Sequence, residues 1–506
     1  MQPAIPRKPY RVLTLDGGGT WALIQAKALG ALYGAETDGW SILDRFDFAA
    51  ANSGGSLVLA MLLKGMTPGA IVALFRDRRE RALIFDRNAI VDRALGGLFG
   101  FGSRYHAPGK FNGLVDIFQR TNGRWGADFA AMPLDLVAAG LNVERAQKGL
   151  GPFHFLITAF DFDAERSVFF RSDPASAAAH FRGAPVPTIA GALHAATNAP
   201  VRYFNRPAEV EFRDGTAINY WDGAVGGYNN PIMAAVVEAL AAEPARREAM
   251  QLLSLGTAGT RLPVVAPAWP GSAPWVVRRK RLRGFDSVRV VSDLRKITAA
   301  MMVDRPEAAS YTAHIALGEP LPALDGRVVS TTRIVRMNPM IQPRYEGLDP
   351  NGHPRWEPYE WFAEASTVRG RTLFERLAAL DMDAVADGEV QDIERLAELW
   401  LEGKVPNQPI HSDDRFVPVI GHGWFADALA AWRKLDAPPR IAPAAEPKRP
   451  SRLAALVQRW RGWLGRWWSQ PRARANAAAA RLGPVAAVEK PPMALPSSVP
   501  GRAPVD

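Results

Sequence analysis

The sequence predicts an α/β fold with a central, mostly parallel sheet flanked by helices. Short apolar and β-branched runs, such as YRVLTL (10–15) and QLLSLG (251–256), are typical of buried strands. Between such runs lie segments like WALIQAKALGALYG (21–34), whose apolar residues recur at helical spacing. Strands that alternate with helices in this way indicate a largely parallel sheet.

The expected elements are clearest in the first 260 residues. In chain order they are strand 10–15, helix 21–34, strand 46–52, helix 56–63, the strand pair 153–160 and 167–171, helix 187–199, strand 217–222, helix 231–242 and strand 251–256. Later residues give weaker signals, namely a proline-rich stretch at 262–275, a basic stretch at 277–284, and helical patterns at 293–303, around 370–402 and at 423–435.

Composition divides the chain into three expected regions. These are a core at 1–260, a mainly helical extension at 261–440 that packs on the core, and a flexible basic tail at 441–506 that is rich in Ala, Pro and Arg. A chain of 506 residues can bury a large core. It has no cysteine, which excludes disulfides, thiolate metal sites and cysteine nucleophiles.

Positive charge is concentrated in the tail. The formal net charge is +10, and residues 441–506 contain eleven basic and three acidic side chains. The rest is nearly neutral, so the basic composition does not indicate a nucleic-acid-binding protein. No apolar run reaches the ~18 residues of a membrane span, and the first residues lack the order of a signal peptide. We expect a cytoplasmic protein, peripheral on the inner face of the membrane if the tail binds lipid.

A serine stands on an expected strand-to-helix turn. In AANSGGSLVLA (50–60), Ser53 follows one apolar run and precedes another. The G-x-S-x-G form of a nucleophile turn needs small residues two before and two after the serine, and here these are Ala51 and Gly55. A helix that begins at Gly54 would aim its N–H groups at the site. The alternative is an ordinary turn serine.

Two further stretches have the form of functional loops. LDGGGT (15–20) contains three consecutive glycines, whose backbone N–H groups can converge on an oxyanion or a phosphate without obstruction by Cβ atoms. Asp222 ends strand 217–222 and is followed by Gly223 and Ala224, at a strand end where a sheet presents functional groups. Taken alone, each stretch is also compatible with a tight turn.

Together the motifs resemble those of the patatin-like phospholipases, a family of acyl hydrolases. The matching residues, in the family's chain order, are Asp16-Gly17-Gly18-Gly19, then Ser53, then Asp222-Gly223-Ala224. Blocks at 192–205, 229–231 and 252–258 resemble the same family, so that the similarity covers about residues 8–260. The resemblance implies a three-layer α/β fold and a lipid acyl hydrolase, of phospholipase A or esterase type, that uses no metal or other cofactor.

The resemblance also implies residue roles. Ser53 would attack the ester carbonyl, and Asp222 would accept its proton in a Ser–Asp dyad, with an acyl-enzyme as intermediate. Backbone N–H groups would hold the oxyanion, and the donors are Gly17, Gly18, Gly19 and Gly54. The residues that would support the turns are Asp16, Gly55, Gly223 and Ala224. His194 and His106 are alternative proton acceptors, and we expect neither to be essential.

One departure from the family pattern keeps other functions open. The family usually has a basic residue and a glycine after the loop's next residue, whereas here Thr20 is followed by Trp21 and Ala22. The loss of that cation puts in doubt a direct contact with an anionic substrate group. The alternative function is a catalytically weak or silent scaffold that binds a membrane or a protein partner. LDGGGT also resembles the phosphate loop of actin- and hexokinase-like proteins, but the other motifs of that class are not found.

The tail contains a segment, RLAALVQRWRGWLGRWWSQ (452–470), with the pattern of an amphipathic helix. Its membrane-facing candidates are Trp460, Trp463, Trp467, Arg459 and Arg466. Tryptophan with arginine is typical of helices that lie on anionic membranes. The alternative is a helix that docks on the protein body or on a partner. The expected partners are thus a phospholipid or other acyl-ester substrate and an anionic membrane, and no nucleic acid.

Overall fold

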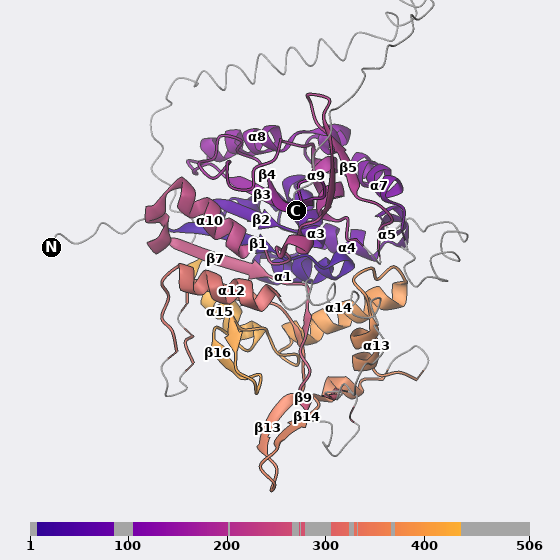
Figure 1. Ribbon diagram of the computed structural model, residues 1–506, viewed down its shortest axis with the longest axis vertical. Coiled ribbons are helices and arrows are strands. Elements are labelled where there is room, and N and C mark those ends of the chain that lie inside the picture. The colour runs from indigo at the N-terminus through magenta and orange to yellow at the C-terminus, as the bar shows by residue number, and fades with distance from the viewer. Residues whose placement is uncertain are drawn as a thin grey trace, which may run out of the picture. The chain divides into compact units, whose positions relative to one another are not determined.

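An eight-stranded sheet forms the centre of the fold, with helices on both of its faces (Figure 1). The computed structural model describes residues 8–84, 105–200, 203–265, 273, 275–278, 305–322, 328–330, 332–365 and 370–436. Met1–Ala442 form one compact unit and Pro443–Asp506 form a second, of which no residue is described. The amphipathic segment predicted at 452–470 and the helix predicted at 293–303 therefore lie outside the described residues.

The sheet follows the order β11-β7-β1-β2-β3-β6-β5, with β4 paired to β3. Its strands are β1 (Tyr10–Leu15), β2 (Phe48–Ala51), β3 (His154–Asp161), β4 (Arg166–Arg171), β5 (Ala208–Glu211), β6 (Ala217–Asp222), β7 (Met250–Leu255) and β11 (Ile334–Met337). The block from β11 to β3 is parallel, whereas β4, β6 and β5 pair in antiparallel fashion. The predicted mostly parallel α/β sheet is thus confirmed.

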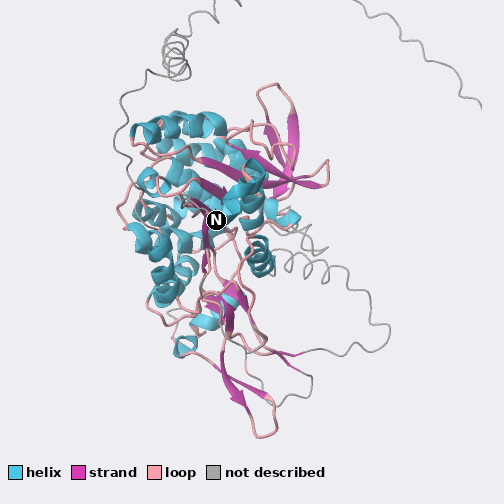
Figure 2. Cartoon of the chain, turned by 90° about the vertical axis from the view of Figure 1, so that its left-hand side faces the viewer, coloured by secondary structure: helices cyan, strands magenta, loops and turns pink. Residues whose placement is uncertain are grey.

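Alternate residues of the strands point into two separate cores. Leu13 and Ala49 belong to a large cluster with α1 (Leu23–Tyr33), α3 (Ser53–Leu63) and α9 (Ile189–Ala196). Their strand neighbours, including Val12 and Phe48, belong to a second cluster with α10 (Ile232–Ala242) and α12 (Arg305–Ala316). A period of two places successive side chains on opposite faces of a sheet, so helices cover both faces in three layers. The layers are seen from the side in Figure 2.

The remaining elements surround this core. The other helices are α2 (Gly39–Leu43), α4 (Pro68–Arg76), α5 (Arg78–Ile84), α7 (Ala107–Arg120), α8 (Leu134–Gln147), α13 (Leu373–Ala379), α14 (Asp387–Leu401) and α15 (Phe425–Leu435). The short strands are β8 (Gly259–Thr260), β9 (Val264–Val265), β10 (Val277–Arg278), β12 (Met340–Ile341), β13 (Arg344–Leu348), β14 (Pro354–Glu357), β15 (His411–Ser412) and β16 (Pro418–Ile420). The β13–β14 hairpin projects away from the sheet (Figure 1). No helix among the described residues is long and apolar enough to cross a membrane.

Two differences from the predicted elements matter for the site. The helix predicted from residue 56 begins at Ser53, and all of its residues are buried, which is typical of a helix packed on every side. The strand β11 was not predicted, although it completes the sheet beside β7. It comes from the region after residue 260, so that this region contributes to the central sheet itself.

Candidate active site

Ser53 lies at the sharp turn between β2 and α3. Its φ is +47°, in the left-handed region that residues with a Cβ rarely adopt, whereas Asn52 before it is extended. The serine is 7% exposed and sits at the N-terminus of α3. A strained serine between a strand and a helix is the geometry of a nucleophile elbow.

The glycine loop packs directly against this turn. A Cβ on Gly54 would lie 2.4 Å from the carbonyl oxygen of Gly19, and a Cβ on Gly17 would lie 2.9 Å from the Cβ of Ser53. Real Cβ atoms do not approach other atoms so closely, so both positions require glycine. The two motifs, more than 30 residues apart in sequence, therefore form one surface.

The N–H groups predicted to hold an oxyanion differ in their partners. Gly17 donates to the carbonyl of Asn229 at 2.9 Å, so its N–H is already engaged. The N–H groups of Gly18 and Gly19 donate to no described residue. The N–H of Gly54 belongs to the first turn of α3, where no intrahelical acceptor exists. Three of the four predicted donors thus have no acceptor among the described residues.

Asp222 ends β6, and its two carboxylate oxygens have different environments. Oδ1 accepts hydrogen bonds from Asn52 Nδ2 and from the N–H of Ala224, both at 2.9 Å. Oδ2 is buried and accepts no hydrogen bond from any described residue. Burial raises the pKa of Asp222, and the Ala224 N–H, the Ser53 hydroxyl and the Asn52 amide partly offset this rise. The Ser53 hydroxyl is thus close to the carboxylate without a well-formed hydrogen bond to it.

Asn52 joins the three motifs, and sequence reasoning missed it. Its amide donates to Asp222, and its Oδ1 accepts from Thr158 Oγ1 at 2.7 Å. A Cβ on Gly223 would lie 2.6 Å from the same Oδ1. The available signal was a single amide among small residues directly before the elbow serine.

A small pocket opens beside Ser53. Its volume is about 30 Å³, the space of roughly two water molecules. It is lined by Gly19, Ser53, Gly54, Leu57, Ile84, Thr197, Ala199, Tyr203, Phe204, Met382 and Asp383. Most of the lining is apolar, although Thr197 and Asp383 also contribute, and a mostly apolar lining suits an acyl group more than a polar one.

Comparison with known proteins identifies the region that holds these motifs. A family model described as "Patatin-like phospholipase" matches residues 13–236, a segment that contains the glycine loop, the elbow and Asp222. This segment belongs to the patatin-like phospholipase family. We call residues 13–236 the patatin-like domain. No curated protein matches the chain significantly.

Solved structures with similarity to the chain are distant in sequence. VipD from Legionella pneumophila is 11% identical with a TM-score of 0.28, over 78% of this chain and 67% of that one. Human GIVD cytosolic phospholipase A2 is 11% identical with a TM-score of 0.32, and the match covers 77% of this chain and 58% of that one. A chain in the complex of SpcU with ExoU from Pseudomonas aeruginosa is 14% identical with a TM-score of 0.21, and the match covers 61% of this chain and 53% of that one. The chain thus spans between about half and two thirds of these solved chains.

Neither histidine considered as a proton acceptor reaches the pocket of the patatin-like domain. His194 is buried in α9, and burial, together with the positive charges of Lys110 and Arg206, lowers its pKa to about 2. His106 is exposed just before α7. No described contact joins either ring to Ser53, and both therefore stay outside the proposed dyad.

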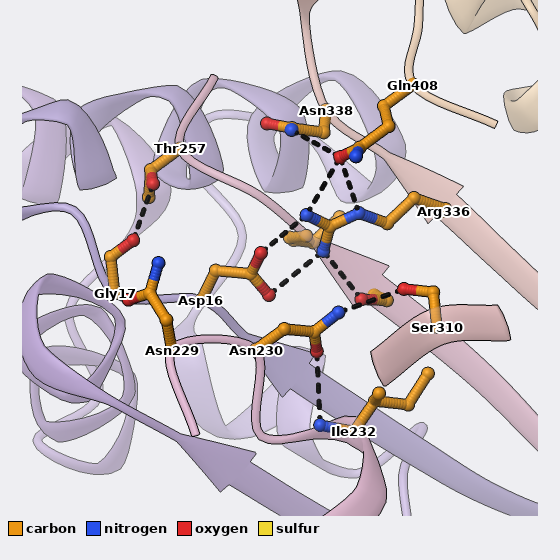
Figure 3. A network of polar contacts seen from close by, with 12 residues as sticks. Asp16, Gly17, Asn229, Asn230, Ile232, Thr257, Ser310, Arg336, Asn338 and Gln408 are labelled. Atoms are coloured by element: carbon orange, nitrogen blue, oxygen red, sulfur yellow. Dashed lines mark hydrogen bonds and ion pairs between the residues drawn. The ribbon is translucent and has the colours of Figure 1, made fainter. Parts of the chain in front are cut away.

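An arginine of the C-terminal half binds the aspartate that begins the glycine loop (Figure 3). Arg336 on β11 donates through both terminal nitrogens to the Asp16 carboxylate, with Nη1 2.9 Å from Oδ1. The same Nη1 donates to Ser254 Oγ at 2.8 Å, and Nη2 donates to Gln408 Oε1 at 3.2 Å. Arg336 and Asp16 are each 2% exposed. Burial raises the pKa of Asp16, and the guanidinium lowers it.

Trp21 occupies the position at which the family usually has a basic residue. Its indole N–H donates to the carbonyl of Asp381 at 3.0 Å, and the ring is largely buried. Trp21 also lines a cavity of about 170 Å³ together with Gly17, Gly18 and Arg336. Among the described residues, Arg336 is a cation that lines this cavity beside the glycine loop, and it comes from another part of the chain.

Among the described residues, no group of three or more His, Asp or Glu could hold a metal ion. The membrane-facing candidates Trp460, Trp463, Trp467, Arg459 and Arg466 lie outside the described residues.

Proposed function

We propose that the patatin-like domain is a serine acyl-ester hydrolase with Ser53 as nucleophile and Asp222 as general base. The observation that supports this proposal best is the pairing of a strained serine with a buried carboxylate oxygen that accepts no other hydrogen bond from the described residues. Open N–H groups on Gly18, Gly19 and Gly54 add the third requirement, which is stabilisation of an oxyanion.

In the proposed acylation step, Ser53 Oγ attacks the ester carbonyl carbon and its proton moves to Asp222 Oδ2. The carbonyl oxygen becomes an oxyanion, held by the N–H groups of Gly18 and Gly19, with Gly54 as a further donor. When the intermediate collapses, the C–O bond to the alcohol breaks and the alcohol takes the proton from Asp222. The acyl group stays on Ser53 as an ester.

Deacylation repeats these steps with water. Asp222 accepts a proton from the water as it attacks the acyl-serine, and Ser53 recovers a proton when the fatty acid leaves. The pocket beside Ser53 is small, so we expect side chains that line it, such as Ile84 and Met382, to move when an acyl chain binds. The proposed substrate is a phospholipid or another fatty-acyl ester.

Covalent labelling tests the nucleophile directly. The full chain is treated with an alkyl fluorophosphonate, and hydrolysis of mixed phospholipid vesicles and a p-nitrophenyl ester is followed. We expect peptide mass spectrometry to find one adduct, on Ser53. The rate of hydrolysis should fall in proportion to the fraction of protein that is labelled. Ser53→Ala should take up no label, while Ser167→Ala, a buried serine on β4, should react like the wild type. Hydrolysis that continues on fully labelled protein contradicts the proposal, and a folded but inactive wild type supports the silent scaffold.

We further propose that the tail attaches the enzyme to anionic membranes, on the basis of the tryptophan and arginine pattern at 452–470 alone. Co-sedimentation with vesicles that contain an anionic phospholipid compares the full chain with one that ends at Ala445. We expect the shorter chain to lose binding, and the binding of the full chain to fall as salt is raised. Equal sedimentation of both chains rules out the tail as the anchor.

A further inference from the structure

One lysine near the proposed dyad is completely buried. Lys110 on α7 is 0% exposed, and no carboxylate of the described residues lies within ion-pair distance of its Nζ. Its Nζ lies 4.3 Å from the ring centroid of Phe204, one of the residues that line the pocket beside Ser53. An unpaired buried ammonium costs free energy, which makes this position unusual for a residue without a role.

Three acceptors surround the amine and indicate its charge state. Nζ lies 2.7 Å from the carbonyl oxygen of His194, 3.2 Å from Thr197 Oγ1 and 2.9 Å from Asn198 Oδ1. Thr197 donates its own proton to Leu193, and the Asn198 amide donates to Arg206, so both oxygens can only accept from Nζ. An ammonium has three N–H donors, whereas a neutral amine has two. Burial lowers the pKa of Lys110 well below its usual value, and the Asp222 carboxylate opposes this effect. The three acceptors match the charged form of the amine.

Asn198 connects this ammonium to the base of the dyad. Its side chain accepts from Lys110, and its backbone carbonyl accepts from the N–H of Asp222 at 3.1 Å. The neutral groups that face the Asp222 carboxylate are the Asn52 amide, the Ala224 N–H and the Ser53 hydroxyl. Among the described residues, Lys110 is the one charged group that shifts the pKa of Asp222. The ammonium lowers the pKa of Asp222, and the carboxylate raises that of Lys110.

We propose that Lys110 is a positioning residue of the active site, which fixes the end of β6 through Asn198 and adds a positive charge that favours the ionised form of Asp222. The inference rests on the proposed function, because it assumes that Asp222 is the base. Without that charge, only the hydrogen bonds from Ala224, Ser53 and Asn52 offset the effect of burial, so the carboxylate is protonated at a higher pH and can no longer accept the Ser53 proton.

The pH profile of hydrolysis separates this role from a structural one. kcat/KM for a p-nitrophenyl ester is measured against pH for the wild type, Lys110→Met, Lys110→Gln and Lys110→Arg, with thermal melts of each. We expect the acid limb of both neutral variants to move to higher pH by about one unit, and that of Lys110→Arg to stay in place. Lys64→Met is the matched control, because Lys64 is also fully buried but binds the carbonyls of Phe118 and Gly126.

Each outcome decides between the two proposals. The inference is overturned if the variants lose the same fraction of activity at every pH, because the lysine is then structural. It is also overturned if both neutral variants unfold while Lys110→Arg folds. An unshifted limb in an active neutral variant overturns it as well, and leaves the dyad intact. If the wild type shows no hydrolysis that depends on Ser53, both the proposed function and the role of Lys110 fall.

Discussion

Asp222→Asn is expected to reduce kcat/KM for ester hydrolysis by about 10²–10⁴-fold while the protein stays folded. Asparagine has the shape of aspartate, so its Oδ1 can still accept from Asn52 and Ala224. In asparagine an NH₂ group replaces Oδ2, the oxygen that accepts no hydrogen bond from a described residue. This group cannot take up the Ser53 proton. Initial rates on a p-nitrophenyl ester, with a thermal melt of each variant, measure the effect.

The wild-type pH dependence follows from the same carboxylate. Only ionised Asp222 can accept a proton, and burial raises its pKa above the value of about 3.9 of an ordinary aspartate. As the pH is lowered, activity should therefore fall at a higher pH than the one at which an ordinary aspartate is protonated. Asp161→Asn is the matched control, because Asp161 is a largely buried aspartate on the neighbouring strand β3. Asp222→Asn activity within tenfold of the wild type would mean that another group is the base.

Arg336→Met is expected to lower the free energy of unfolding by about 3–5 kcal/mol. The substitution removes both hydrogen bonds of the guanidinium to Asp16 and leaves a fully buried carboxylate without its counter-charge. Because Asp16 directly precedes the three glycines, displacement of its backbone should also lower hydrolysis. Urea unfolding and ester turnover of the same samples measure both effects.

A double-mutant cycle assigns this loss to the pair. Arg336→Met with Asp16→Asn should be more stable than the sum of the single effects predicts, because the second change removes the uncompensated charge. Arg213→Met serves as control, since Arg213 is 57% exposed in its ion pair with Asp135 and surface pairs contribute about 0–1 kcal/mol. Additive single effects would show that the two side chains are not coupled.

The sequence was informative where one local segment determines both structure and chemistry. The strand predicted at 10–15 coincides with β1, and Ser53 does lie at the end of β2, because a buried apolar run that stops at small residues specifies both the strand and its turn. The start of α3 was placed three residues late. Gly54 and Gly55 lack the apolar side chains that reveal a helical face, although close packing on the glycine loop requires them.

The residues that the sequence did not reveal act over long distances. Arg336 and Asp16 are 320 residues apart, and Lys110 reaches Asn198 across 88 residues. Neither basic residue belongs to a motif, and a single arginine or lysine is usually a solvated side chain. The roles inferred for Arg336 and Lys110 depend on their burial. Burial follows from the packing of whole strands and helices and not from the neighbouring residues in the sequence.

The position of Arg336 on β11 also sets the order in which the enzyme can mature on the ribosome. Domains fold as their residues emerge, at about 5–20 residues per second. The 320 residues between the two partners of the buried ion pair therefore take about 16–64 s to synthesise. For that interval, the nascent chain holds its glycine loop and its serine without the counter-charge that anchors the loop. The ion pair that anchors the glycine loop can therefore form only after residue 336 has been made.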